Sequence, residues 1–258
     1  MASSVSNTAP HYLHQVLSRV HASGAQSLRE GWSGVLDAEW GSGEFARRHA
    51  EVAALLSETM QQVQALPERA RLRYSRYFSD WWLAVVQPNS GWTDPGRSAN
   101  GLITQDILDH LESAADQIDG ALAGTSSAPR GSNLQDLKDS CTSWLEILRG
   151  APAGDLPVTL QEGLISQILH LIWLIDNADL FGGSRISREA NQVIGSLAQA
   201  AVVNRGDVET TGRWKRALLA FIASAALFTT GATELQNAIG AGDGLVKEIG
   251  SVVDGLSG

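Results

Sequence analysis

The sequence predicts an all-α protein, a helical bundle of about ten helices. Apolar residues recur at steps of three and four along nearly the whole chain, as they do on one face of an α-helix. β-Branched residues lie inside these helical patterns and not in alternating runs, so no strand is predicted. The chain has 258 residues, of which 43% are hydrophobic and 18% charged, and this composition is ordinary for a globular protein with a buried core.

Five helices are expected in the first half of the chain. Ser42 is a suitable cap for the third, because its side chain can accept a hydrogen bond from the first turn. Pro67 ends that helix and opens the next, since proline suits only the first turn of a helix. The five are expected over about 10–20, 28–36, 42–66, 67–86 and 102–122. The Pro- and Gly-rich stretch 88–101 is expected to be a surface loop with an exposed Trp92.

Five more helices are expected in the second half. They should span about 134–148, 160–180, 187–203, 211–231 and 234–256, with Asn133 as the cap of the first. The stretch 123–133 (AGTSSAPRGSN) is the best linker candidate. The chain therefore forms either one domain or two divergent helical halves. In the second case an N-terminal bundle over 1–122 is joined by this linker to a C-terminal bundle over 134–258.

Composition limits the classes of function. The formal net charge is −9 and the sequence pI about 5.1, so nucleic acid is not an expected partner of the surface as a whole. Cys141 is the one cysteine, which excludes an intramolecular disulfide, and its amphipathic surroundings predict a packed, inert thiol. The N-terminus lacks an apolar signal region, and no apolar run reaches the roughly 18 to 20 residues of a standard spanning helix. We therefore expect a cytoplasmic protein.

The motifs of common enzyme and cofactor sites are missing, so no cofactor is predicted. Three histidines fall on nearly one face of the first helix: His11, His14 and His21. No carboxylate lies among them in the sequence, so a shared metal ion is not the favoured interpretation. Asp109, Glu112 and Asp116 share one face of a later helix. A solvated acidic face is the favoured interpretation there, and a metal site is the alternative.

One segment combines arginines with aromatic rings. On a single helix three arginines would cluster on one side: Arg69, Arg73 and Arg76. The rings of Tyr74, Phe78 and Trp81 would overlap that side. Guanidinium groups with rings can grip a nucleic-acid strand, but a core helix also extends its arginines to the surface over buried rings. In an acidic protein we favour the core helix, with a patch for an anionic protein partner as the alternative.

Two predicted helices are apolar nearly all round, over 164–175 and 217–228. A helix without a polar face must be surrounded, so these two are expected to form the central hairpin of the core. A basic turn precedes the second, and a glycine-interrupted apolar stripe follows it. The candidate residues for binding a partner or a membrane come from these flanks: Arg213, Trp214, Lys215, Arg216, Leu245, Ile249, Val252 and Val253. Packed core, assembly helix and membrane insertion are the alternatives for this end of the chain.

The layout resembles that of uncharacterised bacterial all-helical proteins found with abortive-infection and anti-phage systems. Three features carry the resemblance: an early helix with Trp32, Val35 and Leu36, a long helix with Val52, Leu55 and Leu56 that ends near Pro67, and an apolar C-terminal helix led by Trp214. The resemblance implies a role in defence or stress. It carries over no functional residues.

Three functional hypotheses follow from these patterns. The first is a non-enzymatic interaction protein that self-associates or docks on a protein partner through its C-terminal helices. The second is a membrane-active effector, pore-forming or membrane-disrupting, which associates with a membrane on activation. The third is a metal-dependent enzyme with an acidic helical site. The missing catalytic motifs favour the first hypothesis.

Overall fold

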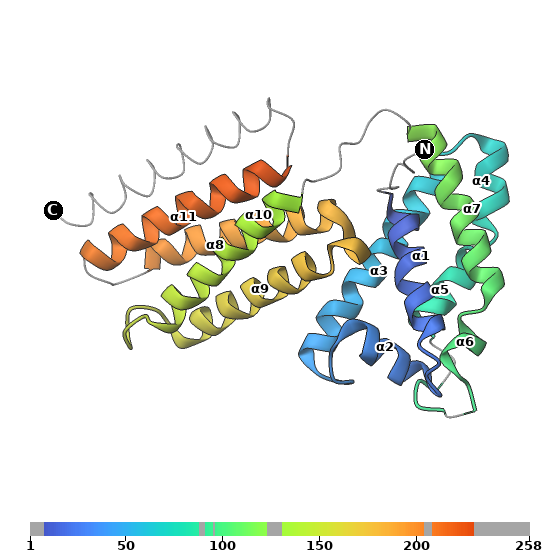
Figure 1. Cartoon of the computed structure of the whole chain (residues 1–258), viewed down its shortest axis with the longest axis horizontal. Helices are drawn as coiled ribbons and strands as arrows, with labels where there is room; N and C mark the ends of the chain where they lie inside the picture. Colours follow the sequence, from blue (N-terminus) through green and yellow to red (C-terminus); the bar gives the residue numbers. More distant parts are fainter. Residues whose placement is uncertain (1–7, 88–90, 95, 123–130, 204–207, 230–258) are drawn as a thin grey trace. The chain divides into compact units, whose positions relative to one another are not determined.

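The computed structural model describes residues 8–87, 91–94, 96–122, 131–203 and 208–229 (Figure 1). Within these ranges the chain forms eleven α-helices, and the only β-type pairing is one isolated bridge between Ala153 and Leu156. The predicted all-α class is therefore confirmed. The last expected helix, over 234–256, lies outside the described residues.

The chain divides into two compact units, which we describe separately. Unit 1 comprises residues 1–126 and the short stretch 179–182, and unit 2 comprises residues 127–178 and 183–258. The first division falls inside the stretch 123–133 that was expected to be a linker, but α8 already begins at Gly131 within it. Asn133 therefore lies inside the helix, and the prediction that it caps the helix is wrong. The return of the chain to unit 1 over 179–182 was not expected, because composition and periodicity carry no information on such a long-range contact.

Unit 1 contains seven helices arranged around α1. Their bounds are Ala9–Ala22 (α1), Leu28–Leu36 (α2), Gly43–Gln64 (α3), Glu68–Ser75 (α4), Phe78–Val86 (α5), Ala99–Leu102 (α6) and Gln105–Leu122 (α7). Helix α1 packs against α2, α3, α6 and α7. Its inward side chains are fully buried at Leu13, Val16, Leu17 and Val20, the residues whose spacing predicts this helix. Burying each of them contributes about 1.5–3 kcal/mol, which makes α1 the centre of this core.

Side-chain caps define the starts of α2 and α3. Ser27 accepts a hydrogen bond from the backbone N–H of Glu30, and Ser42 accepts one from Phe45. The second of these is the cap that the sequence predicts. Asp37 terminates α2 with a left-handed backbone (φ 49°), which turns the chain toward α3.

The helix expected over 67–86 is two helices, α4 and α5. At the start of α5 Tyr77 has φ −92° and ψ 0°, and its ring stacks on His110 of α7 with the centroids 3.8 Å apart. The interruption allows this ring to reach α7, a tertiary contact that helical periodicity cannot predict. The helix expected over 102–122 begins at Gln105 as α7, because Ile103 leaves the helical region with ψ 88°. The short helix α6 before it lies at the end of the stretch 88–101, which was expected to be a loop.

Unit 2 is arranged around α8. Its helices are Gly131–Arg149 (α8), Val158–Asp176 (α9), Ala178–Val203 (α10) and Val208–Thr229 (α11). Helices α9 and α11 each pack mainly on α8, so the expected central hairpin of two apolar helices is wrong. An apolar run predicts burial but does not specify the neighbour. The neighbour is α8, whose buried side chains are Leu137, Cys141, Trp144, Leu145 and Leu148.

The two apolar helices are not surrounded on all sides, contrary to expectation. Leu169 of α9 and Leu219 of α11 are 44% and 39% exposed. Among the described residues, α9 is also the one helix long and apolar enough to cross a membrane by length and composition, which the sequence analysis did not expect. A core helix passes the same test, and Leu171 and Leu174 of α9 are fully buried.

Helix α10 is interrupted at Gly182, where the backbone is not helical (φ 72°, ψ 168°). The stretch 179–182 belongs to unit 1, where Asp179 forms an ion pair with Arg19 of α1. In the same unit a β-carbon at position 182 would lie 2.3 Å from Cε2 of Tyr12. Only glycine fits both this backbone and this contact. The helix expected from residue 187 therefore begins earlier than predicted.

Candidate functional site

The first turns of α11 expose three cationic side chains, those of Arg213, Lys215 and Arg216. Three apolar side chains are exposed further along the helix: Leu219, Ala220 and Ala223. These apolar residues follow Arg216 at steps of three, four and seven, so they share one side of the helix with it. We call these six residues the α11 outer face. A cationic start followed by apolar side chains suits a partner surface that is both acidic and apolar.

Trp214 lies in the same basic turn but is buried. Its ring meets Trp144 of α8 edge to face, with the centroids 5.0 Å apart. Trp144 Nε1 donates a hydrogen bond of 3.2 Å to the carbonyl oxygen of Ala217, and Ser224 Oγ lies 3.1 Å from Ser140 Oγ. These contacts hold α11 on α8. Trp214 therefore anchors the helix, while its cationic neighbours are presented to solvent.

The other predicted C-terminal binding residues lie outside the described residues: Leu245, Ile249, Val252 and Val253. Their part in binding a partner or a membrane stays a prediction, based on their helical spacing in the sequence.

The predicted arginine patch is exposed, but the helix is interrupted inside it. Arg69 and Arg73 lie on α4, whereas Arg76 follows its end. The guanidinium carbon of Arg76 lies 4.8 Å from the centroid of the Tyr77 ring, and Arg76 Nη2 donates to the Tyr77 hydroxyl at 2.9 Å. That ring stacks in turn on His110. Arg76, the residue that caps the end of α4, is therefore held by an aromatic neighbour.

The fold brings His14 of α1 close to carboxylates of α7 that are far from it in the sequence. Burial lowers the pKa of His14 on α1, while Glu112 and Asp109 of α7 act in the opposite direction. The histidines of the first helix have no carboxylate among them in the sequence, but His14 has carboxylates nearby in space, because α1 packs on α7. His21 has a structural contact instead, since its Nδ1 lies 2.6 Å from the carbonyl oxygen of Ile103.

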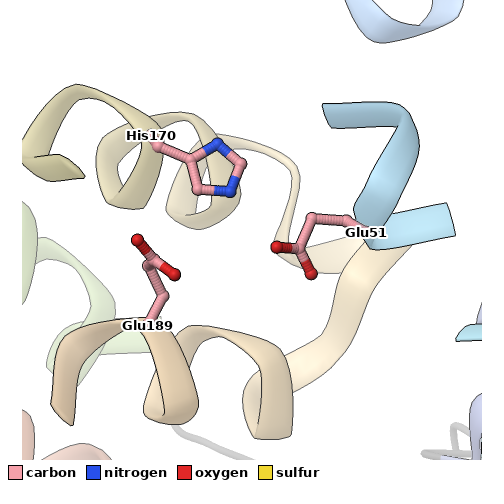
Figure 2. A group of neighbouring side chains, drawn as sticks. All are labelled: Glu51, His170 and Glu189. Atoms are coloured by element: carbon pink, nitrogen blue, oxygen red, sulfur yellow. The ribbon is translucent and has the colours of Figure 1, made fainter. Parts of the chain in front are cut away.

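In unit 2, His170 of α9 and Glu189 of α10 have possible ligand atoms within 4.8 Å of each other (Figure 2). His170 is buried and stacks on Trp173 with the centroids 5.8 Å apart. Imidazole and carboxylate groups together suit zinc and similar metals, but such sites use at least three protein ligands. Glu51, also drawn in Figure 2, is a residue of unit 1 and not of unit 2. The pair alone does not make a metal site.

A cluster of five rings in unit 1 is the main feature that the sequence analysis missed. Its members are Trp32, Trp40, Phe45, His49 and Trp92, and we call it the aromatic corner. The indoles of Trp40 and Trp92 lie 4.7 Å apart at a tilt of 40°. Trp92 is half-buried, so the expectation of an exposed ring in a loop is wrong. No spacing rule connects rings that come from different helices and a loop.

His49 lies inside this corner. Its Nε2 is 3.1 Å from the carbonyl oxygen of Val85, and because a carbonyl only accepts, this nitrogen carries the proton. Burial lowers the pKa of His49, and the bond to Val85 offsets part of that effect. The imidazole stacks on Phe45 at 5.8 Å and meets Trp32 edge to face at 5.2 Å. These contacts give His49 a structural role.

No protein-family model, curated protein or solved structure matches the chain. The candidate sites therefore depend on side-chain chemistry alone. Among the predicted binding residues within the described part of the chain, Arg213, Lys215 and Arg216 occur together with several exposed apolar side chains on α11, and Arg69 and Arg73 occur with one, Leu72, on α4.

Proposed function

We propose that this chain is a non-enzymatic assembly protein that self-associates through the α11 outer face. The observation that supports this proposal is the contrast between the two sides of α11. One side is anchored by buried Trp214, and the other exposes three cations followed by Leu219, which is 39% exposed. Exposed apolar side chains beside cations, on a helix that buried contacts hold in place, are compatible with a protein contact surface.

A second copy of the chain offers a surface of complementary charge. Helix α7 of unit 1 exposes a row of carboxylates, Asp106, Asp109, Glu112 and Asp116, and the whole chain has a net charge of −9. Contact between α11 of one copy and α7 of another would pair opposite charges. Exposed ion pairs contribute only about 0–1 kcal/mol each, so burial of Leu219 and its alanine neighbours must supply much of the affinity.

The molar mass in solution tests the apolar part of this proposal. We expect light scattering to show an assembly larger than one chain for the wild type, and a monomer for Leu219→Asp, because a buried unpaired carboxylate opposes association. Val158→Asp is the matched control, since Val158 of α9 is 66% exposed and lies outside both the α11 outer face and the arginine patch of α4. It should assemble like the wild type. A circular-dichroism melt confirms that each variant folds.

The contribution of the cationic side chains to assembly is tested by reversing their charge and by raising the salt concentration. Arg213→Glu combined with Arg216→Glu should weaken the assembly, and raising the salt from about 0.05 M to about 0.5 M should weaken the wild-type assembly as well. A wild-type chain that stays monomeric at all concentrations would overturn the proposal. So would an assembly that Leu219→Asp leaves unchanged.

A membrane-active effector is a second candidate, favoured by the apolar length of α9 and by the cations of α11. Vesicles with anionic lipids, loaded with a dye, distinguish it from the assembly protein. Dye leakage that is abolished by combining Arg213→Glu with Arg216→Glu would support the membrane role, and vesicles that stay intact would exclude it.

For either candidate, the resemblance to anti-phage proteins suggests a role in bacterial defence or stress, which survival of expressing cells under phage challenge would test.

A further inference from the structure

We propose that the aromatic corner of unit 1 is a binding site for a small alkylammonium cation, held against the exposed indole of Trp40. The site is independent of the α11 outer face. It joins two observations on the same few residues: tilted aromatic rings at the surface and a local excess of negative charge.

The rings provide the first part of the site. Trp40 is 37% exposed, although its indole already contacts Phe45 at 4.9 Å and Trp92 at 4.7 Å. Its neighbours are fixed in turn, because the backbone carbonyl of Trp92 accepts a hydrogen bond of 2.9 Å from the N–H of Arg29. An exposed indole held in this way loses little conformational freedom when a ligand binds.

The charges provide the second part. Residues 37–44, which contain Trp40, include three acidic residues and no basic one: Asp37, Glu39 and Glu44. Glu44 and Asp37 both pair with the single buried guanidinium of Arg48, Asp37 at 3.8 Å, and Asp94 lies 3.8 Å from Arg97 in a separate pair. Glu39 is exposed immediately beside Trp40. Asp37, Glu39 and Glu44 thus outnumber the one guanidinium that pairs with two of them, and this local excess of negative charge favours a cationic ligand over an anionic one.

The chemistry of the ligand follows from these two parts. The face of an indole carries negative charge density and attracts cations within about 6 Å, best of all when the cation is weakly hydrated. A quaternary ammonium group meets that requirement because its methyl groups spread the charge and give it an apolar surface. A neutral ligand of the same shape would gain only the apolar contact. A preference for the charged ligand over the neutral one therefore distinguishes this site from an apolar surface.

Choline and its neutral isostere 3,3-dimethylbutanol test the proposal on the unmodified full chain. We expect choline to broaden its N-methyl proton signal in ligand-observed NMR and to bind about tenfold or more tightly than the isostere. Equal binding of the two compounds would overturn the proposal, and so would the absence of choline binding at millimolar concentration.

Two variants locate the site. Trp40→Leu should abolish choline binding, whereas Trp82→Leu should not, since Trp82 of α5 is a comparably exposed indole (41%) outside the corner. Glu39→Gln should weaken choline binding severalfold and leave the isostere unaffected. If Trp40→Leu fails to fold, Glu39→Gln and the isostere comparison still decide. Binding that survives Trp40→Leu, or that is lost in Trp82→Leu, would place the site elsewhere and overturn the proposal.

Discussion

Trp144 of α8 and Trp214 of α11 meet edge to face at 89°, with their ring centroids 5.0 Å apart. Both rings are buried, and the pair supplies the aromatic contact by which α11 is held on α8 in unit 2. The relationship explains how one helix can be anchored and still present cations. Trp214 points toward α8, while Lys215 and Arg216, its neighbours in the chain, are exposed.

Trp214→Ala should destabilise unit 2 by about 3–5 kcal/mol, because it removes a large buried ring and leaves a cavity against Trp144. Urea unfolding followed by circular dichroism measures the change. Trp82→Ala is the control, and its loss should be below about 1 kcal/mol because the side chain is substantially exposed. Equal losses for the two variants would show that the edge-to-face pair does not hold α11.

Arg48→Ala should lower the free energy of unfolding by about 2–5 kcal/mol. The buried Arg48 guanidinium donates to the carbonyl oxygen of Leu36 at 2.7 Å and to that of Asp37, and it pairs with Glu44. Without it these carbonyls at the end of α2 lose their donors. Arg48→Lys should recover only part of the loss, because one ammonium group cannot reproduce the guanidinium fork.

The control for Arg48 is Arg69→Ala on the exposed surface of α4, which should change stability by less than about 0.5 kcal/mol. Chemical unfolding of all three variants under identical conditions makes the comparison. If Arg48→Ala were as stable as the wild type, water would be satisfying the carbonyls equally well.

Helical periodicity predicted the class of the fold and most of its helices, because a buried stripe leaves a local signature. In α1 the residues Leu13, Val16 and Val20 are buried as their spacing implies. The Ser42 cap was predictable for a similar reason, since cap and helix are adjacent in the chain. Local signatures also predicted the exposed cations around Trp214, although not the burial of Trp214 itself.

Features that depend on contacts between distant residues could not be predicted. Periodicity marks 217–228 as apolar but does not say that α11 packs on α8. The break at Tyr77 depends on the stack with His110, and the aromatic corner depends on Trp92 reaching α3 from a loop. The carboxylates near His14 lie on α7, about ninety-five positions further along the chain. In each case tertiary packing, and not local propensity, determines the outcome.

Cys141 should be inert in the folded protein. Burial among the side chains of α8 and its neighbours raises the pKa of this thiol to about 12, so almost none of it is thiolate at neutral pH. We expect no reaction with Ellman's reagent at about pH 8 within minutes, and stoichiometric reaction in about 6 M urea. The chain has one cysteine, so the signal has a single source. Rapid labelling without denaturant would mean that unit 2 opens readily.

Stability should fall at mildly acidic pH because of His49. Burial lowers the pKa of His49 in the folded chain, below the ordinary value of about 6.5 that applies after unfolding. Between these two pKa values the unfolded chain binds the proton more strongly than the folded chain. The contribution of neutral His49 to the free energy of unfolding is therefore complete above about pH 6.5 and is lost as the pH falls below that value. Urea unfolding at about pH 7.5 and pH 5.5 should show this loss for the wild type.

His49→Gln isolates that contribution, because glutamine can still donate to the carbonyl oxygen of Val85 but does not titrate. The pH dependence of its unfolding should be shallower than that of the wild type. Burial also lowers the pKa of His14. His14 is present in both proteins, so its effect on the pH dependence of unfolding cancels in the comparison. Identical slopes for the two proteins would show that His49 is not the group responsible.

Gly182→Ala should be among the most damaging small substitutions in the described part of the chain. A β-carbon at this position would lie 2.3 Å from Cε2 of Tyr12, and the backbone has φ 72° and ψ 168°, a conformation nearly restricted to glycine. We expect a loss of about 3 kcal/mol or more in urea unfolding. Adding Tyr12→Leu should relieve the clash but not the backbone strain, so the double variant should remain unstable.

Gly195→Ala is the matched control on the same helix. A β-carbon there meets no atom within 4 Å, and the residue is exposed. Alanine should therefore stabilise the protein slightly, by up to about 1 kcal/mol, since it restricts the unfolded chain and favours the helix. The opposite signs expected at 182 and 195 separate a positional requirement for glycine from a general effect of the residue type. If both substitutions stabilised the protein, the backbone at 182 would be free to become helical, and α10 would run without interruption through Gly182.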